Sequence, residues 1–458
     1  MQRKFLERED RKRLELKLVA ADLTLELFLG PLGTIGSSSL LAPVISCLPY
    51  IVNIMSIPEC MENNDPNVLK VGMIGGSSGF ISNAHQRAIF MDGTRRVVCG
   101  ALSSNVMKSR AAIENWPYPI QGYNSYDELL EAELAKPDSD RIDYVLILTP
   151  NHVHFDPAKK FLEAEIPVLC EKPLTFTLDE AETLAEIVHS KGIPFCVAHT
   201  YLGHWTSRLA RFIVQSGLIG EVRWVDASYL QSWMCIRSRD PEFVKKAWRL
   251  DASRSGLSNC GGDIGTHALM QLRYVTGLEV VSLSAHMESL TPLPEPVEQP
   301  LDDHFTVYCR MNNGSRALIR ATQIGVGHKN DLRIEVNGEL GSIRWAQEES
   351  EKLEVYLIDQ PERTYYRGGI KPNDGFFGDI PKELLDEPTI PWGHSEGFHD
   401  AFARLHRCFE GDVRSFKKSQ YEPRDGSKYA TVGDGVVGMH FVKKAVESSR
   451  NGNAWVDC

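Results

Sequence analysis

A lysine between an apolar segment and a proline is the first residue whose setting suggests chemistry. The tripeptide Glu171-Lys172-Pro173 follows Pro167-Val168-Leu169-Cys170, which has the composition of a buried strand. Because a residue before proline is pushed to extended conformations, Lys172 cannot easily begin a regular helix. Open α/β sheets bind ligands at the carboxyl ends of their strands. We therefore expect the Lys172 ammonium group at that edge, where it could stabilise negative charge developing on an oxygen atom.

A second candidate centre carries a carboxylate and an imidazole. Within residues 258–267, Asp263 and His267 are four residues apart, so on a helix they would share one face. Three glycines in the same segment would allow close approach of the backbone. Histidine has the near-neutral pKa that a general base needs, and a carboxylate could orient it or share a substrate hydroxyl. The plainer alternative is a helix that Asp263 caps, with His267 as a satisfied polar residue.

A glycine-rich turn follows the first apolar segment, residues 69–74. A dinucleotide-binding fold needs small residues there, so that backbone amides reach a pyrophosphate at a helix N-terminus. The turn is not a strict G-x-G-x-x-G, because Ser77 and Ser82 stand near positions where glycine would be expected. Its place after the first strand of a βαβ run favours the dinucleotide site over an ordinary turn. The candidate cofactor-binding residues here are Gly75, Gly76, Ser77, Gly79, Phe80 and Ile81.

The next two strand ends supply further cofactor-binding candidates. The second strand ends at Ser103 and Ser104, with no acid in place to hold an adenosine ribose. Serines can bind a ribose hydroxyl or a 2′-phosphate, and Lys108 and Arg110 follow closely, so NAD is only slightly favoured over NADP. The third strand ends in a segment that is either a polar loop or a wall of the cofactor crevice, Thr149-Pro150-Asn151-His152.

Strands and helices alternate through residues 67–198, which predicts a doubly wound parallel sheet. From residue 199 to residue 458 the chain instead carries successive strands joined by turn signals, with few helices, which predicts an α+β domain with an open, mainly antiparallel sheet. The strands expected in the first part are residues 69–74, 96–102, 142–148, 168–170 and 194–198; those expected in the second are 222–231, 280–287, 304–311, 316–323, 332–337, 342–347 and 353–358.

Length and composition are those of a soluble globular protein with a sizeable core. The chain has 458 residues, 42% hydrophobic and 24% charged, and a net charge of -11 that argues against non-specific nucleic-acid binding. Ten cysteines are scattered without a C-x-x-C pair, so we expect reduced thiols and no metal site.

The first 66 residues are expected to lie outside the fold. Residues 2–17 are densely charged, and residues 27–58 contain no charged residue. That stretch is long enough to span a bilayer, although three prolines interrupt it. We favour an extension of a cytoplasmic protein with no catalytic role, and keep a membrane anchor as the alternative.

Taken together, these motifs resemble the Gfo/Idh/MocA oxidoreductase family, from about Val71 to the C-terminal helices. Its markers are Glu171-Lys172-Pro173, Thr149-Pro150-Asn151-His152 and Gly261-Gly262-Asp263-Ile264-Gly265-Thr266-His267. Further motifs are similar to its levoglucosan-dehydrogenase-like branch: Ala198-His199-Thr200-Tyr201, Ala247-Trp248-Arg249, Arg254-Ser255-Gly256, Trp345-Ala346-Gln347-Glu348 and Gly393-His394-Ser395-Glu396-Gly397. The glycine turn departs from the branch pattern at Ser77 and Ser78.

The resemblance implies a Rossmann domain, a second domain that builds the substrate cleft, and a homo-oligomer, dimer or tetramer, formed through the C-terminal sheet. It implies Lys172, Asp263 and His267 as catalytic residues, NAD or NADP as cofactor, and a sugar or polyol as substrate. Glu171, Lys172, Trp248 and Arg249 would complete the cofactor site; for Arg249 the alternative is a surface ion pair. The substrate site would use Lys172, Asp263 and His267 together with the aromatic residues Tyr229 and Trp233. Trp248 and Trp345 could also stack on a sugar. For each of these aromatic residues, the alternative is packing in the core.

Two other functions stay open. Some members of the family oxidise a glycoside transiently with bound NAD and release its aglycone, which makes the protein a hydrolase. The fold also serves non-catalytic regulators that sense sugars or cofactors. The presence of Lys172, Asp263 and His267 together argues against the regulator.

Overall fold

The structure, a computed structural model, describes residues 67–246, 248–292, 300–371, 375–378, 380–386, 390–423 and 428–458. These residues belong to one compact unit of the chain. The expectation of an extension or membrane anchor falls on residues 1–66 and lies outside the described residues. None of the helices in the described ranges has the length and apolar character needed to cross a membrane.

Six parallel strands form the first sheet, in the order β3-β2-β1-β4-β5-β6, which confirms the predicted doubly wound sheet. The strand order reverses between β1 and β4, which is where such sheets bind ligands. The strands are β1 (Leu69–Gly75), β2 (Arg95–Ala101), β3 (Gln121–Gly122), β4 (Tyr144–Leu148), β5 (Val168–Cys170) and β6 (Phe195–Val197). The helices between them are α3 (Phe80–Met91), α4 (Val106–Glu114), α5 (Tyr126–Leu134), α6 (Phe155–Glu163) and α7 (Leu178–Lys191), with a 3-10 turn, η2 (Asn151–Val153).

Local signals explain several of these boundaries. Ser125 caps α5 by accepting a hydrogen bond from the Glu128 amide at 3.1 Å, and Gly192 ends α7 with φ 61. Helix α4 was not expected from the sequence. Its only buried residue is Ser109, so it has no apolar stripe from which a helix could be predicted.

Nine strands form the second sheet, in the order β14-β13-β12-β11-β7-β10-β9-β8-β15. Only the β7–β10 pair is parallel, which confirms the mainly antiparallel prediction. The strands are β7 (Val222–Leu230), β8 (Val280–Glu288), β9 (His304–Met311), β10 (Arg316–Thr322), β11 (Asp331–Gly338), β12 (Gly341–Ala346), β13 (Lys352–Leu357), β14 (Arg363–Tyr366) and β15 (Val456–Asp457).

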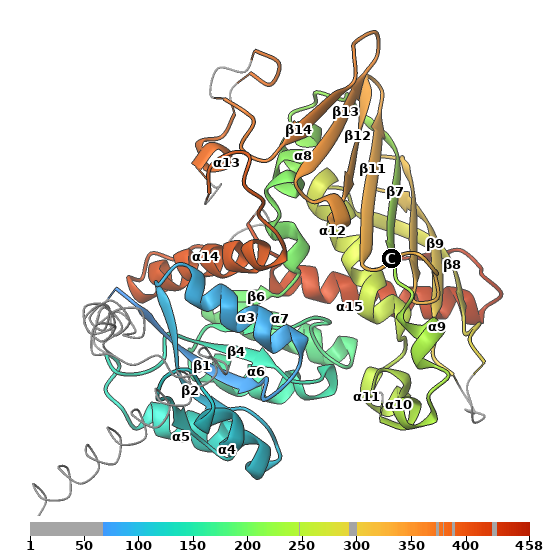
Figure 1. The fold of residues 1–458 in the computed structure, drawn as a ribbon. Coiled ribbons are helices and arrows are strands. Elements are labelled where there is room, and N and C mark those ends of the chain that lie inside the picture. Colours follow the sequence, from blue (N-terminus) through green and yellow to red (C-terminus); the bar gives the residue numbers. More distant parts are fainter. Residues whose placement is uncertain are drawn as a thin grey trace, which may run out of the picture. The chain divides into compact units, whose positions relative to one another are not determined.

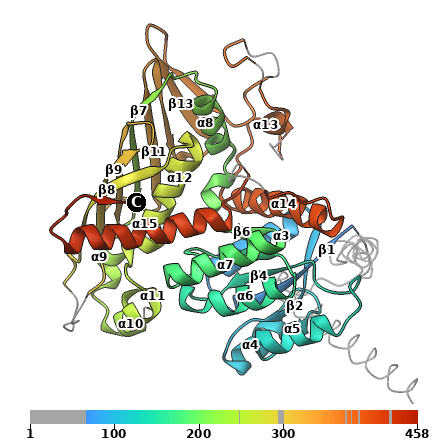
Figure 2. The ribbon, with the colours of Figure 1, turned by 180° about the vertical axis from the view of Figure 1, so that it is seen from behind.

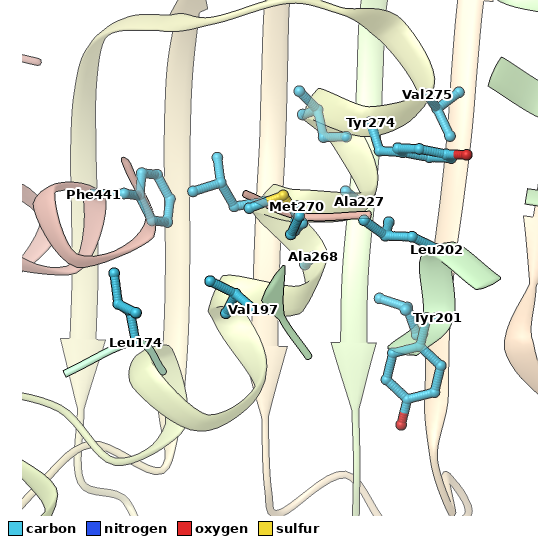
Figure 3. Packing of buried hydrophobic residues seen from close by; sticks show 14 of the residues in the cluster. Leu174, Val197, Tyr201, Leu202, Ala227, Ala268, Met270, Tyr274, Val275 and Phe441 are labelled. Atoms are coloured by element: carbon cyan, nitrogen blue, oxygen red, sulfur yellow. The ribbon is translucent and has the colours of Figure 1, made fainter. Parts of the chain in front are cut away.

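Three helices cover one face of this sheet, as Figures 1 and 2 show: α8 (Trp205–Gln215), α12 (Thr266–Thr276) and α15 (Val432–Arg450). The short helices α9 (Trp233–Arg237), α10 (Pro241–Lys246), α11 (Ala252–Ser255) and α13 (Lys382–Asp386) lie in the connections. Side chains of both halves meet in one buried cluster, where Leu174 and Val197 lie near Met270 and Phe441 (Figure 3). Tyr201 lies at the margin of this cluster with its hydroxyl pointing away from the other labelled side chains (Figure 3).

Helix α14 (Phe398–Lys417) lies against α3 of the first half (Figure 1). Its Leu405 and Phe409 share a buried cluster with Val71 of β1. The buried Arg95 at the start of β2 forms a 2.5 Å ion pair with Glu410. The segment predicted as the first domain, residues 67–198, therefore depends on a helix from near the end of the chain.

Candidate active site

Lys172 joins the two halves of the molecule. It follows β5, and its ammonium Nζ donates hydrogen bonds to the Oδ1 carboxylate oxygen and to the main-chain oxygen of Asp263, both at 2.8 Å. The lysine side chain is only 13% exposed. Since an ammonium group has three donors, the described residues account for two and leave one for a ligand in the adjacent cleft.

Asp263 lies on a π-helical turn, η5 (Gly261–Gly265), directly before α12. Its other carboxylate oxygen, Oδ2, lies 3.3 Å from Arg249 Nε and accepts a hydrogen bond from Gln323 Nε2 at 3.3 Å. Burial by itself would raise the pKa of Asp263, but the Arg249 guanidinium and the Lys172 ammonium hold that pKa well below its usual value. Asp263 is therefore an ionised carboxylate that fixes the position of Lys172.

His267 lies in the first turn of α12 and is buried, with 8% of its surface exposed. Its Nδ1 lies 3.3 Å from Nδ1 of His199, a residue that follows β6. Burial, followed by the charge of Lys172, lowers the pKa of His267 well below its usual value, so the imidazole is neutral. The expectation that Asp263 and His267 share one α-helix is corrected, because the π-helical turn holds Asp263 and only His267 lies on α12.

A cleft of about 1200 Å³ runs past these residues and is lined by both halves of the molecule. Most of the residues predicted from the sequence line it: Gly75, Gly76, Ser77, Gly79, Phe80, Ile81, Ser103, Ser104, Thr149, Pro150, Asn151, Glu171, Lys172, Tyr229, Arg249, Asp263 and His267. His152 and Trp233 are not among the lining residues. Trp345 is 3% exposed and donates its indole N–H to Thr206, so it is a core residue. The Trp248 side chain lies outside the described residues.

The glycine turn has the form of an anion-binding cradle. Gly75 and Gly76 have φ of 77 and 81, a region that favours glycine. A Cβ atom on Gly76 would lie 2.7 Å from Met73 Cε and 2.9 Å from Ser82 Oγ, so a side chain would fill the turn. Helix α3 begins immediately afterwards at Phe80, with no side-chain cap and no acidic residue in its first turn. Its amide groups therefore remain available to a pyrophosphate, and the turn fits a dinucleotide.

The opposite end of the cleft has hydroxyl groups and one cation. Ser103 and Ser104 follow β2, and Lys108 of α4 also lines this region. The carboxylates among the described lining residues, Glu171 and Asp263, both belong to the Lys172 end. The described residues therefore leave both NAD and NADP open at the ribose.

A polar network next to His267 was not predicted in full. The hydroxyl groups of Tyr201 and Tyr229 lie 2.6 Å apart, and Asn330 Nδ2 donates to the Tyr201 hydroxyl at 2.9 Å. Gln231 Nε2 donates to Asn330 Oδ1 at 2.8 Å. Three of these residues lie next to strand ends: Tyr201, Gln231 and Asn330. Their place beside strand ends is the sequence signal that could have identified them. Phe398 of α14, which stacks on Phe80 at 5.5 Å, had no such signal.

Glu171 ends a buried histidine chain formed by Tyr144, His406, His85 and Glu171. Its Oε1 lies 2.9 Å from His85 Nε2, and its Oε2 accepts the Lys172 amide at 3.1 Å. His85 Nδ1 lies 2.8 Å from His406 Nε2, and His406 Nδ1 lies 3.4 Å from the Tyr144 hydroxyl. Burial would raise the pKa of Glu171, but His85 and Lys172 lower it below its usual value. The buried histidine chain therefore anchors the turn that carries Lys172.

The parallel sheet, the glycine cradle and the lysine at the carboxyl end of β5 define a dinucleotide-binding oxidoreductase fold. Two family models match the chain: the oxidoreductase family with an NAD-binding Rossmann fold over residues 69–199, and the GFO/IDH/MocA C-terminal domain over residues 207–344. The chain belongs to the GFO/IDH/MocA oxidoreductase family.

Characterised relatives include sugar dehydrogenases. The chain is 29% identical to levoglucosan dehydrogenase of Pseudarthrobacter phenanthrenivorans, over 65% of this chain and 79% of that protein. The structure of an inositol dehydrogenase homolog from Azotobacter vinelandii in complex with NAD+ is similar, with a TM-score of 0.76, 28% identity, and coverage of 86% of this chain and 98% of that one. A levoglucosan dehydrogenase complex with NADH and levoglucosan has a TM-score of 0.69 at 26% identity, and covers 85% of this chain and 99% of that one.

Proposed function

We propose that this protein is an NAD(P)-dependent dehydrogenase that transfers a hydride between a nicotinamide cofactor and a CH–OH group of a sugar, anhydrosugar, inositol or glycoside. One observation carries the proposal. Lys172 of the first half converges with Asp263 and His267 of the second half in a cleft that also contains the glycine cradle. Dehydrogenases that bind sugars and polyols are among the relatives, which supports this class of substrate.

The nicotinamide ring, when bound, supplies the hydride acceptor. In oxidation, Nε2 of the neutral His267 takes the substrate's hydroxyl proton, since its Nδ1 contacts His199. The remaining N–H of Lys172 donates to the same substrate oxygen and stabilises the negative charge that develops there. Asp263 holds the ammonium group in place and accepts a hydrogen bond from a hydroxyl group of the sugar. His267 and Lys172 thus act on one oxygen atom from two sides.

The same cleft would hold the remainder of the cofactor. The glycine turn and the first turn of α3 would bind the pyrophosphate, and Ser103 and Ser104 would bind the adenosine ribose. Thr149, Pro150 and Asn151 would form the wall beside the nicotinamide. We favour NAD over NADP because similar solved structures are complexes with NAD+ or NADH.

The test is a substrate panel with a matched variant. The purified chain is incubated with NAD or NADP and with pyranoses, anhydrosugars, inositols and glycosides, and reduced cofactor is followed by absorbance. We expect turnover of at least one polyol, and loss of that turnover in Lys172→Met, which keeps the length of the side chain and removes its charge. Turnover of simple aliphatic alcohols alone would contradict the proposal, and release of an aglycone without accumulation of NADH would indicate a hydrolase.

We also propose that the protein is a homo-oligomer that associates through the second sheet. Helices cover one face of that sheet, and the strands alternate buried with exposed side chains, including Tyr308, which is 51% exposed. Light scattering coupled to size-exclusion chromatography measures the mass directly, and the mass of a single chain would refute this part of the proposal.

A further inference from the structure

Two buried imidazoles meet through the same type of nitrogen. His199 follows β6 and is 3% exposed, and its Nδ1 lies 3.3 Å from Nδ1 of His267. The two rings are nearly perpendicular, with an interplanar angle of 82°. Because a hydrogen bond needs one donor and one acceptor, only one of these two nitrogens can carry a proton when both rings are neutral.

The position of that proton decides what His267 offers to the cleft. If His267 Nδ1 carries it, His267 Nε2 has a lone pair and can act as a base. If His199 Nδ1 carries it, His267 Nε2 carries a hydrogen and can act only as a donor. No described residue forms a hydrogen bond with Nε2 of His267, so the contact with His199 is the one that selects between these forms.

Among the residues that the structure describes, no other group forces either form. The ring of His267 packs edge-on against Tyr201 at 4.9 Å and against Tyr229 at 5.8 Å between ring centres. The two tyrosine hydroxyl groups form a hydrogen bond with each other. The carboxylate of Asp263 is taken by Lys172, Gln323 and Arg249. Burial lowers the pKa of both histidines, so both rings are neutral and a single proton lies between their two Nδ1 atoms.

We propose that His199 is a positioning residue that sets the tautomer of His267. In sugar oxidation it accepts the Nδ1 proton of His267 and thereby leaves Nε2 free to take the hydroxyl proton. In the reverse direction the same hydrogen bond is kept: His267 starts doubly protonated, its Nε2 gives a proton to the carbonyl oxygen, and it returns to the neutral form with its proton on Nδ1. This inference rests on the proposed function of His267. His199 acts by orienting the proton of His267 and does not contact the substrate.

Three substitutions of His199 separate this role from simple packing. The side-chain amide of Asn would occupy the position of Nδ1 of His199 and can accept or donate a hydrogen bond. His199→Asn should therefore keep kcat near the wild-type value. The amide of Gln stands near the position of Nε2 and cannot reach His267, and Phe has no polar atom. We expect His199→Gln and His199→Phe to lower kcat by about 10- to 100-fold, the usual range for loss of an orienting partner. KM and the dissociation constant of NADH should stay unchanged.

A second measurement needs no turnover. The ¹⁵N shifts of His267, assigned by their loss in His267→Gln, report which ring nitrogen carries the proton. We expect the Nδ1–H form in the wild type and in His199→Asn, and the Nε2–H form in His199→Phe. The same tautomer in all three proteins would overturn the inference, as would full kcat in both His199→Gln and His199→Phe. Absence of any sugar turnover would refute the proposed function, while the NMR result would still decide the tautomer.

Discussion

Two pairs of buried histidines contact the candidate active site, and they differ in what lies at their ends. In the buried histidine chain, Glu171 is an ionised carboxylate and can only accept, so His85 Nε2 must donate to it. With one proton on each ring, His85 Nδ1 accepts from His406 Nε2, and His406 Nδ1 accepts from Tyr144. In that state the carboxylate sets the direction of every hydrogen bond in the chain.

The pair of His199 and His267 has no carboxylate at either end among the described contacts. His267 faces the cleft, so the direction of the hydrogen bond with His199 decides what its Nε2 can do there. The comparison teaches that a carboxylate at one end makes a buried histidine pair a fixed support, whereas a pair without one leaves the tautomer of the ring in the cleft to its histidine partner.

The largest expected effect is on the pair of His199 and His267. His267→Gln removes the proposed base but keeps a polar side chain, and we expect kcat to fall about 10²–10⁴-fold, the usual contribution of general acid–base catalysis. The dissociation constant of NADH and the thermal midpoint should change little, because the glycine turn that would bind the cofactor precedes α3, whereas His267 lies on α12. Steady-state kinetics with a substrate from the panel tests this, and a variant with wild-type kcat would remove His267 from the chemistry.

The next effect is on the fixed chain and should appear in stability. His406→Phe leaves His85 Nδ1 without its donor and the Tyr144 hydroxyl without its acceptor. At about 1–3 kcal/mol for each buried unpaired group, the free energy of unfolding should fall by about 2–5 kcal/mol. The matched control is His406→Gln, whose amide can still donate to His85. Urea denaturation measures both, and equal stabilities of the two variants would show that the chain is not a support.

The smallest expected effect is a pH dependence that compares the two pairs. Burial, then the charge of Lys172, lowers the pKa of His199 to about 4, with Arg273 also lowering it and Asp434 and Glu171 opposing. A depressed histidine pKa contributes stability that is present above the unfolded value of 6.5 and is lost as pH falls towards the folded value.

From pH 7 to pH 5 the wild type should therefore lose about 2 kcal/mol more of its unfolding free energy than His199→Asn loses. Burial also lowers the pKa of His406, so His406→Gln should relieve the acid loss in the same direction. Urea titrations at the two pH values provide the test. Identical pH dependence in all three proteins would mean that neither pair is buried in its neutral form.

The sequence predicted the parallel sheet and most strand positions because apolar runs and turn residues are local signals. It also singled out Lys172, Asp263 and His267, which line one cleft, because glycine-rich and proline-containing motifs mark strand and helix ends; their catalytic roles stay a prediction. It did not predict His199 as the partner of His267, nor His85 and His406 as partners of Glu171, because these contacts join residues far apart in the chain. Nor could it distinguish Tyr229, which lines the cleft, from Trp345, which packs in the core, since both are aromatic residues on strands.

Helix α14 has a consequence for how the protein is made. Val71 of the first strand shares a buried cluster with Leu405 and Phe409, and His406 completes the support of the lysine turn. During translation, the nucleotide-binding sheet therefore leaves the ribosome long before its covering helix exists. The nascent sheet keeps an uncovered apolar flank until synthesis is nearly finished, and a message truncated before α14 would yield a product prone to aggregation.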